Sequence, residues 1–238
     1  MIVAIDIGNT RVKVGVREGK DWLMRTALPT PEAARLAELA AEWPNGTQVV
    51  ASNVAGEAVE SAVTQALAGR HPLRWLRSSR EACGVRSSYE FPEKLGADRW
   101  AALIGARAQH ASDCLVVCAG TATTVDHLDA NGVFRGGLIL PGIDLMRSSL
   151  ARNTAQLPFA EGVCSEHPRS TVDAIVSGCL FAQTGAIERM FSHVAGEPDA
   201  LCLITGGAAA AIVPHLRIPC RPAENLILEG LLRFAREG

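Results

Sequence analysis

The residues with the clearest chemical potential lie within the first thirteen positions of the chain. Asp6 ends an apolar run, and the segment Gly8-Asn9-Thr10 follows before a second β-rich run, 12–16. Glycine adopts positive φ without steric penalty and asparagine tolerates it, so this spacing predicts a tight turn between two strands. The tip of such a hairpin directs backbone N–H groups and the Thr10 hydroxyl towards an anion.

Two charged side chains flank this turn. Asp6 is placed to hold a hydrated Mg²⁺ beside the anion, because Mg²⁺ prefers carboxylate oxygen and keeps several waters. Lys13 adds a positive charge nearby. The alternative is a solvated hairpin without a ligand, since short turn motifs recur by chance.

A similar pattern returns about half a chain later. An apolar run, 116–119, leads into Gly120 and Thr121, and a second β-rich run then ends at Asp126. Two hairpins of this kind suggest a duplicated α/β unit that closes on a nucleotide.

A third informative stretch runs from Tyr89 to Trp100 and contains Gly96-Ala97-Asp98-Arg99. Local rules favour Asp98 as the N-cap of a helix, with Arg99 exposed behind it. Alternatively, the Asp98 carboxylate accepts a hydroxyl proton, and the Arg99 guanidinium binds a carboxylate or phosphate with paired hydrogen bonds. Tyr89 is the only tyrosine, and it is either a binding residue or a half-buried loop anchor.

The composition limits the class of protein. The chain has 238 residues, 48% hydrophobic and 20% charged, with a net charge of −2, which is typical of an ordered globular protein. Without a basic stripe, a signal-peptide pattern or an apolar run of ~18 residues, we expect a cytoplasmic protein that binds neither nucleic acid nor membrane. Seven cysteines without a C-x-x-C pair indicate reduced thiols rather than zinc.

Hydrophobic periodicity and breaker residues predict the elements that position these residues. Strands are predicted over 2–7, 11–17, 20–28, 48–52, 73–77, 114–118, 122–128, 132–140, 201–205 and 216–220. Helices are predicted over 31–43, 55–69, 98–111, 142–151, 171–194, 208–213 and 223–236, with a loop over 78–95. The repeated order predicts two similar α/β domains, 1–113 and 114–238, with a cleft between them.

Taken together, the motifs resemble the type III pantothenate kinases, also called the Bvg accessory factor family. Six motifs occur in the family's order over nearly the whole chain: Asp6-x-Gly-Asn-Thr-x-x-Lys13, Tyr89-x-x-Pro92-x-x-Leu-Gly96-x-Asp98-Arg99, Gly120-Thr121-Ala-Thr, Gly136-Gly-x-Ile139-x-Pro-Gly142, Ser170-Thr171 and Thr205-Gly-Gly207. Each motif is weak alone, but six in register are specific.

The resemblance implies two duplicated actin-like (ribonuclease H-like) domains, a homodimer, and ATP-dependent phosphorylation of the pantothenate hydroxyl, which opens coenzyme A synthesis. It implies that Asp98 accepts the proton. The ATP site would consist of Asp6 (near Mg²⁺), Gly8, Asn9, Thr10, Lys13, Thr121, Gly206 and Gly207. The pantothenate site would consist of Tyr89, Gly96, Ala97, Asp98, Arg99, Ile139 and, from the second subunit, Thr171.

One position departs from the family pattern. The family usually has Asp where this chain has Cys118, and that aspartate is the family's ligand for a monovalent cation, K⁺ or NH₄⁺. A neutral thiol is a poor ligand for a hard cation, so we predict a lost, weakened or relocated potassium site. Asp126 is either a substitute ligand or a satisfied carboxylate at the strand end.

Two other motifs have structural alternatives. The glycines from Gly136 to Gly142 fit a strand that ends in a tight turn, and they also allow close approach of a ligand or a backbone. Ser170 and Thr171 fit the N-terminus of a long helix, which does not exclude a contact with substrate. The apolar face of that helix, which includes Phe181, could pack across a two-fold axis.

Two further functions compete with the kinase. Another actin-like phosphotransferase or phosphatase, such as an exopolyphosphatase, is disfavoured because basic clusters for a polyanion are missing. An ATP-binding regulatory or accessory protein that keeps the kinase fold would be consistent with Cys118. The presence of Asp6, Asp98 and Arg99 together favours catalysis.

Overall fold

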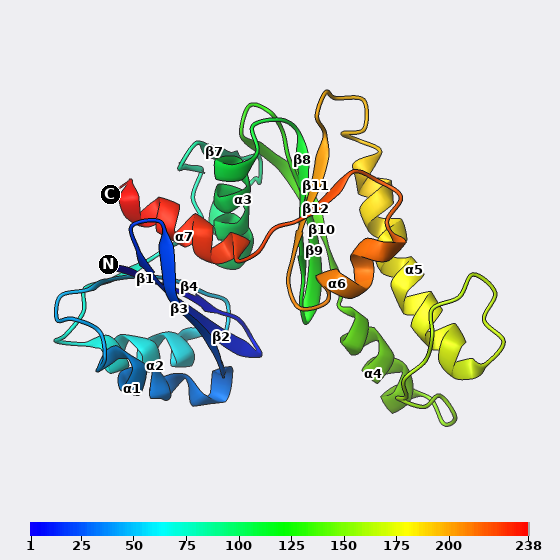
Figure 1. Cartoon of the computed structure of the whole chain (residues 1–238), viewed down its shortest axis with the longest axis horizontal. Helices are drawn as coiled ribbons and strands as arrows, with labels where there is room; N and C mark the ends of the chain where they lie inside the picture. The colour runs from blue at the N-terminus through cyan, green and yellow to red at the C-terminus, as the bar shows by residue number, and fades with distance from the viewer. Residues whose placement is uncertain (238) are drawn as a thin grey trace. The chain divides into compact units, whose positions relative to one another are not determined.

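The computed structural model describes residues 1–237 and separates into two compact units (Figure 1). Unit 1 comprises Met1–Ala111, Gly132–Phe134 and the segment from Asn225 onwards. Unit 2 comprises Ser112–Asn131 and Arg135–Glu224. The chain therefore leaves unit 1, builds unit 2, and returns to unit 1 for its last helix.

A five-stranded sheet forms the centre of unit 1. Its strands are β1 (Ile2–Ile7), β2 (Arg11–Glu18), β3 (Asp21–Pro29), β4 (Gln48–Asn53) and β5 (Leu73–Trp75), in the order β3-β2-β1-β4-β5. The first three strands form an antiparallel meander, whereas β1, β4 and β5 run parallel. The five strands predicted in this region are confirmed, with their ends shifted by at most two residues.

Helices cover both faces of this sheet (Figure 1). Alternate apolar residues such as Val3, Ile5 and Ile7 share a core with η1 (Thr30–Arg35), α1 (Leu36–Ala40) and α2 (Glu57–Leu67). The opposite face packs against α3 (Ala97–Gln109) and α7 (Leu226–Arg236). These two helices cross so closely that a Cβ on Gly230 of α7 would overlap the backbone of α3. The helix predicted over 31–43 is a 3-10 turn followed by the short α1.

The segment between β5 and α3 contains more structure than the predicted loop over 78–95. It forms β6 (Glu81–Ala82), β7 (Val85–Ser87) and η2 (Pro92–Lys94). β6 and β7 are an antiparallel pair, and β7 also pairs with Val133 and Phe134 at the start of β10. Strands of two or three residues are too short to show a periodic pattern, which explains why the sequence did not indicate them.

Unit 2 repeats the sheet of unit 1. Its strands are β8 (Cys114–Ala119), β9 (Ala122–Leu128), β10 (Val133–Pro141, which belongs to this unit from Arg135 on), β11 (Leu201–Thr205) and β12 (Cys220–Pro222). The strand order β10-β9-β8-β11-β12 corresponds strand for strand to β3-β2-β1-β4-β5. The predicted duplication is thus confirmed, although the strand expected over 216–220 lies at Cys220–Pro222.

The helices of unit 2 are α4 (Ile143–Asn153), α5 (Thr171–Phe191) and α6 (Ala209–Ile212), followed by η3 (Val213–His215). Leu180, Ile187 and Phe191 of α5 pack on β8 and β9 in the core of the unit. Phe181 is 43% exposed.

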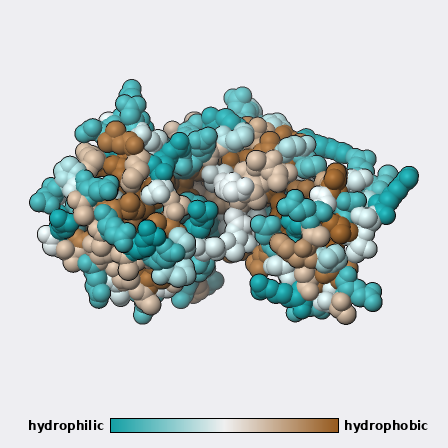
Figure 2. Space-filling model, turned by 60° about the horizontal axis from the view of Figure 1, so that its bottom comes forward, coloured by the Kyte–Doolittle hydropathy of each residue, from teal (hydrophilic) through white to brown (hydrophobic). Residues whose placement is uncertain are grey.

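On the face of the chain that Figure 2 shows, hydrophilic side chains are interspersed with apolar patches. Several of the chain's large exposed apolar side chains belong to β10, α4, α5 and the segment between these helices: Leu138, Ile139, Leu145, Leu150, Phe159, Val163 and Phe181. Within residues 1–237, none of the helices combines the length and the apolar character needed to cross a membrane.

Candidate active site

The β1–β2 turn in unit 1 is held by backbone and side-chain hydrogen bonds. The Gly8 amide donates to the Arg11 carbonyl (3.0 Å), and the Thr30 hydroxyl donates to the Gly8 carbonyl (2.7 Å). Asn9 and Thr10 are exposed at the tip. Neither Gly8 nor Asn9 has positive φ, so the turn does not use the conformational freedom expected of them.

Asp6 lies in the middle of a row of three side chains from neighbouring strands. In the strand register, Asp6 of β1 is opposite Lys13 of β2 on one side and Ser52 of β4 on the other. The Ser52 hydroxyl donates to Asp6 Oδ1 (3.2 Å), and Lys13 Nζ lies 3.6 Å from Asp6 Oδ2. Ser52 did not emerge from the sequence, because the pairing of β1 with β4 depends on a strand distant along the chain.

Asp6 is 4% exposed, and this burial raises the pKa of its carboxyl group. The negative charge of Asp98 acts in the same direction, whereas Lys13 and the Ser52 hydroxyl lower the pKa. Asp6 and Asp98 are therefore close enough within unit 1 for their charges to interact. A cation between them would offset this repulsion.

Asp98 lies in the first turn of α3 but does not cap it. The N-cap is Gly96, without a side-chain hydrogen bond, and Asp98 Oδ1 instead accepts from the Arg99 amide (2.8 Å). The N-cap alternative for Asp98 is therefore wrong. A Cβ on Gly96 would come within 2.6 Å of Asp98 Oδ1, so the glycine leaves room for this carboxylate. Ala97, between them, is buried.

Arg99 is buried beside two aromatic rings rather than exposed behind a cap. Its side chain is 5% exposed, and Nη1 donates to the Tyr89 hydroxyl (3.2 Å). The guanidinium carbon lies 5.9 Å from the centre of the Tyr89 ring and 5.7 Å from that of Phe134. Tyr89 is half-buried and packs on Phe134, while its carbonyl accepts from Arg80 (3.0 Å). Tyr89 is thus an anchored loop residue, and its hydroxyl meets Arg99.

The β8–β9 turn in unit 2 is also exposed at its tip. Gly120 and Thr121 form the turn, in which the Gly120 amide donates to the Ala122 carbonyl (3.0 Å). The Gly142 amide donates to the Thr121 carbonyl (2.8 Å), and a Cβ on Gly142 would overlap the Gly120 carbonyl oxygen. Gly142 is therefore required where the backbone before α4 meets this turn.

The two residues directly opposite Cys118 on the neighbouring strands are neutral. In the strand register, Cys118 of β8 lies between Thr124 of β9 and Thr205 of β11. Asp126 is fully buried two residues further along β9, and a Cβ on Gly137 of β10 would overlap its Oδ1. The glycine in the middle of β10 thus permits the close approach of a strand to Asp126. Further along β10, Ile139 is 65% exposed.

The two glycines after β11 differ in their surroundings. Gly206 has a φ of +104°, and a Cβ there would overlap the carbonyl oxygen of Ala119. A Cβ on Gly207 would meet nothing within 4 Å. The backbone of unit 2 alone therefore explains Gly206, whereas the open space beside Gly207 is compatible with a ligand.

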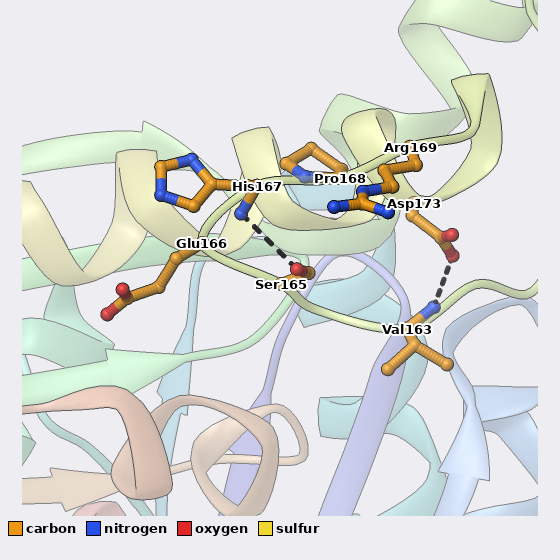
Figure 3. A pocket seen from close by; sticks show the side chains of 7 residues that line it. All are labelled: Val163, Ser165, Glu166, His167, Pro168, Arg169 and Asp173. Atoms are coloured by element: carbon orange, nitrogen blue, oxygen red, sulfur yellow. Dashed lines mark hydrogen bonds between the residues drawn. The ribbon is translucent and has the colours of Figure 1, made fainter.

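Ser170 is the N-cap of α5, because its hydroxyl accepts from the Asp173 amide (3.1 Å) and donates to the Asp173 carboxylate (2.7 Å). Thr171 is the exposed first residue of this helix. A surface hollow of about 510 Å³ lies alongside (Figure 3). Its lining residues are Val163, Ser165, Glu166, His167, Pro168, Arg169 and Asp173. It lies in unit 2 and contains none of the acidic residues described in unit 1.

Comparisons with known proteins show the family of this sequence. Residues 2–193 match the family model described as type III pantothenate kinase. A type III pantothenate kinase of Aromatoleum aromaticum is 55% identical over 238 residues, covering 100% of this chain and 98% of the relative. That of Dechloromonas aromatica is 50% identical over 236 residues, covering 99% of each chain.

Solved structures with low sequence identity share the fold. A protein described as a Baf family transcriptional activator from Campylobacter jejuni has a TM-score of 0.66 at 19% identity, covering 99% of this chain and 98% of that one. The ROK hexokinase of Thermus thermophilus has a TM-score of 0.51 at 15% identity, covering 99% and 98%. The fold class is that of the actin-like sugar kinases, with two ribonuclease H-like domains. With the family model covering most of its length, the chain belongs to the type III pantothenate kinase family.

Proposed function

We propose that this chain transfers the γ-phosphoryl group of ATP to the hydroxyl of pantothenate, the first step of coenzyme A synthesis. Family membership supports this function. The observation that carries it is the grouping of Asp6, Lys13 and Asp98 in unit 1, with Arg99 following Asp98 in the first turn of α3. Phosphoryl transfer needs positioning and charge neutralisation more than covalent chemistry, and these groups provide both.

In this proposal the exposed turn of β1 and β2 binds phosphate oxygens through Gly8, Asn9 and Thr10, with Lys13 as a nearby positive charge. Thr121, Gly206 and Gly207 of unit 2 keep the ATP-binding roles that the resemblance implies. Mg²⁺ bound with ATP supplies neutralisation of the phosphate charge. Asp6 fits this ion, because its carboxylate is buried beside a second acidic group and Mg²⁺ prefers carboxylate oxygen.

On the substrate side, Asp98 orients the attacking hydroxyl and accepts its proton. Arg99 binds the carboxylate of pantothenate, since a planar guanidinium can donate two parallel hydrogen bonds. Tyr89 orients Arg99 through its hydroxyl, and Gly96 and Ala97 keep the substrate close to α3. Ile139 is exposed on β10 and offers an apolar contact.

We further propose a homodimer in which Thr171 reaches the substrate site of the second subunit. The exposed apolar side chains of unit 2, among them Ile139 (65% exposed) and Val163 (73% exposed), support an association through this unit. Mixing a chain carrying Asp98→Asn with one carrying Thr171→Ala tests the proposal. If Thr171 acts across the dimer, mixed dimers contain one intact site and regain activity, whereas a contact within one chain gives no recovery.

The position of Cys118 bears on whether the protein needs a monovalent cation. Cys118 and its neighbours Thr124 and Thr205 supply no carboxylate in their row, so this position does not fit a site that depends on one. We therefore propose turnover without strict dependence on K⁺ or NH₄⁺. The cytoplasmic location expected from the sequence stays a prediction.

The deciding experiment measures ADP release by the purified protein with ATP and Mg²⁺, with and without pantothenate. Release that depends on pantothenate supports the kinase. Binding of ATP without such release would favour the alternative, an accessory protein that keeps the kinase fold.

A further inference from the structure

We infer that Ser52 is a positioning residue for the phosphoryl transfer, acting by fixing the carboxylate of Asp6. The inference rests on the function proposed above, because it takes Asp6 as the carboxylate that serves Mg²⁺ and phosphate. It adds a residue from β4, an element outside every motif that indicated the site.

The strand register determines which side chains flank Asp6. Residues opposite one another on paired strands project from the same face of the sheet. Asp6 is opposite Lys13 on β2 and opposite Ser52 on β4, so the central carboxylate has one neighbour on each side. Shifting either strand by one residue would turn its side chain to the other face. The register is therefore what delivers both neighbours to Asp6.

Lys13 and Ser52 differ in their exposure to solvent. The Lys13 side chain is 48% exposed and lies 3.6 Å from Asp6 Oδ2, so it can move towards a bound phosphate. Ser52 is fully buried, and its hydroxyl donates to Asp6 Oδ1 at 3.2 Å. The buried contact therefore restrains one carboxylate oxygen, while the other lies next to the half-exposed ammonium group of Lys13.

This arrangement sets the direction of the carboxylate. A carboxylate accepts through both oxygens, and the terminal torsion of an Asp side chain is broad, so packing alone does not fix its plane. The Ser52 hydroxyl holds Oδ1 towards β4. Asp6 Oδ2 is then the oxygen available to water on Mg²⁺ or to the ammonium group of Lys13.

The chain also offers a matched control. Ser78, in the same unit, carries a buried hydroxyl for which the structure shows no hydrogen-bond partner. Ser78→Ala removes the same atom as Ser52→Ala without removing a contact to a carboxylate. A general effect of deleting a buried hydroxyl would appear in both variants.

The experiment compares Ser52→Ala, Ser52→Thr and Ser78→Ala in two assays: pantothenate-dependent ADP release, and calorimetric binding of ADP with Mg²⁺ or with EDTA. For Ser52→Ala we expect about a tenfold loss of kcat and about tenfold weaker ADP binding with Mg²⁺, because a hydrogen bond to a charged group is lost. In EDTA, Ser52→Ala should bind ADP as tightly as the unmodified chain does in EDTA. Ser52→Thr, which keeps the hydroxyl, should recover most of the loss, and Ser78→Ala should match the unmodified chain.

A double-mutant cycle separates positioning from general structure. If Ser52 acts through Asp6, adding Ser52→Ala to Asp6→Asn should leave Mg²⁺-dependent ADP binding no weaker than Asp6→Asn alone. Additive losses, equal losses with Mg²⁺ and with EDTA, or unchanged binding in Ser52→Ala would each overturn the inference. If the unmodified chain released no ADP with pantothenate, the proposed function would fail, and the binding cycle would still decide the role of Ser52.

Discussion

The two hairpins of the molecule share a backbone plan but differ in the side chain at one equivalent position. In unit 1 the residue two before the turn glycine is Asp6, between Lys13 and Ser52. In unit 2 it is Cys118, between Thr124 and Thr205. The same sheet thus carries a charged row in one copy and a neutral row in the other. The two units therefore share the backbone of the hairpin, whereas the carboxylate at this position occurs in unit 1.

The largest effect should come from making the first hairpin neutral like the second. Asp6→Asn keeps the size of the side chain but removes its charge, and we expect kcat to fall by about 10³-fold, as for the loss of a strong electrostatic group. Steady-state ADP release measures this. Cys118→Ala, the matched change in unit 2, should keep kcat within about twofold, because small apolar changes to a half-buried thiol are well tolerated. Equal losses in both variants would contradict the comparison.

The next effect concerns Asp98, the acidic residue whose charge acts on Asp6. Asp98→Asn should lower kcat by about 10²-fold or more if Asp98 accepts the hydroxyl proton. The charge of Asp98 raises the pKa of Asp6, so Asp98→Asn lowers this pKa and keeps the Asp6 carboxylate ionised. Binding of ADP with Mg²⁺ should therefore change little. Near-normal turnover would refute the role of Asp98 as proton acceptor.

A smaller effect is expected for the buried guanidinium. Arg99→Lys keeps the charge but loses the planar pair of donors, so the KM for pantothenate should rise by about 30-fold. The KM for ATP serves as the internal control and should not change. A thermal melt should accompany the kinetics, because Arg99 also contacts the Tyr89 hydroxyl and two rings. A parallel rise in both KM values would indicate general damage to the site.

The smallest effect is expected from the reverse change, in which the hairpin of unit 2 is given the carboxylate that unit 1 has. Cys118→Asp places a carboxylate in the neutral row and should create a stimulation by K⁺ of about threefold, since hard cations favour oxygen ligands. Activity is compared in potassium-containing and potassium-free buffers at constant ionic strength. Strict potassium dependence in the unmodified chain would show that the cation is held without a carboxylate at position 118.

Much of the fold was readable from the sequence, because its strands are long and regular. Both hairpins, the helix that presents Asp98 and the repeated strand order were predicted from periodicity and turn residues. The short strands β6 and β7 were not, since two or three residues carry no period.

Residues of the site were predictable where a motif carries them and not where they depend on packing. Asp98 was expected as a cap by local rules, but Gly96 takes that position and frees the carboxylate. Ser52 was missed because its partner lies 46 residues away, across a pairing that no local pattern encodes. Gly206 has no room for a side chain because the backbone of Ala119, on another strand, lies against it. This contact likewise could not be predicted from the local sequence.

The return of α7 to unit 1 has a consequence for how the protein is made. The sheet of unit 1 is complete in sequence by residue 75, yet one of its faces packs on a helix that begins at Leu226. During synthesis this face therefore lacks its contact with α7 until the whole of unit 2 has emerged from the ribosome. The strand that carries Asp6 is therefore fully packed only after α7 has been made, late in synthesis.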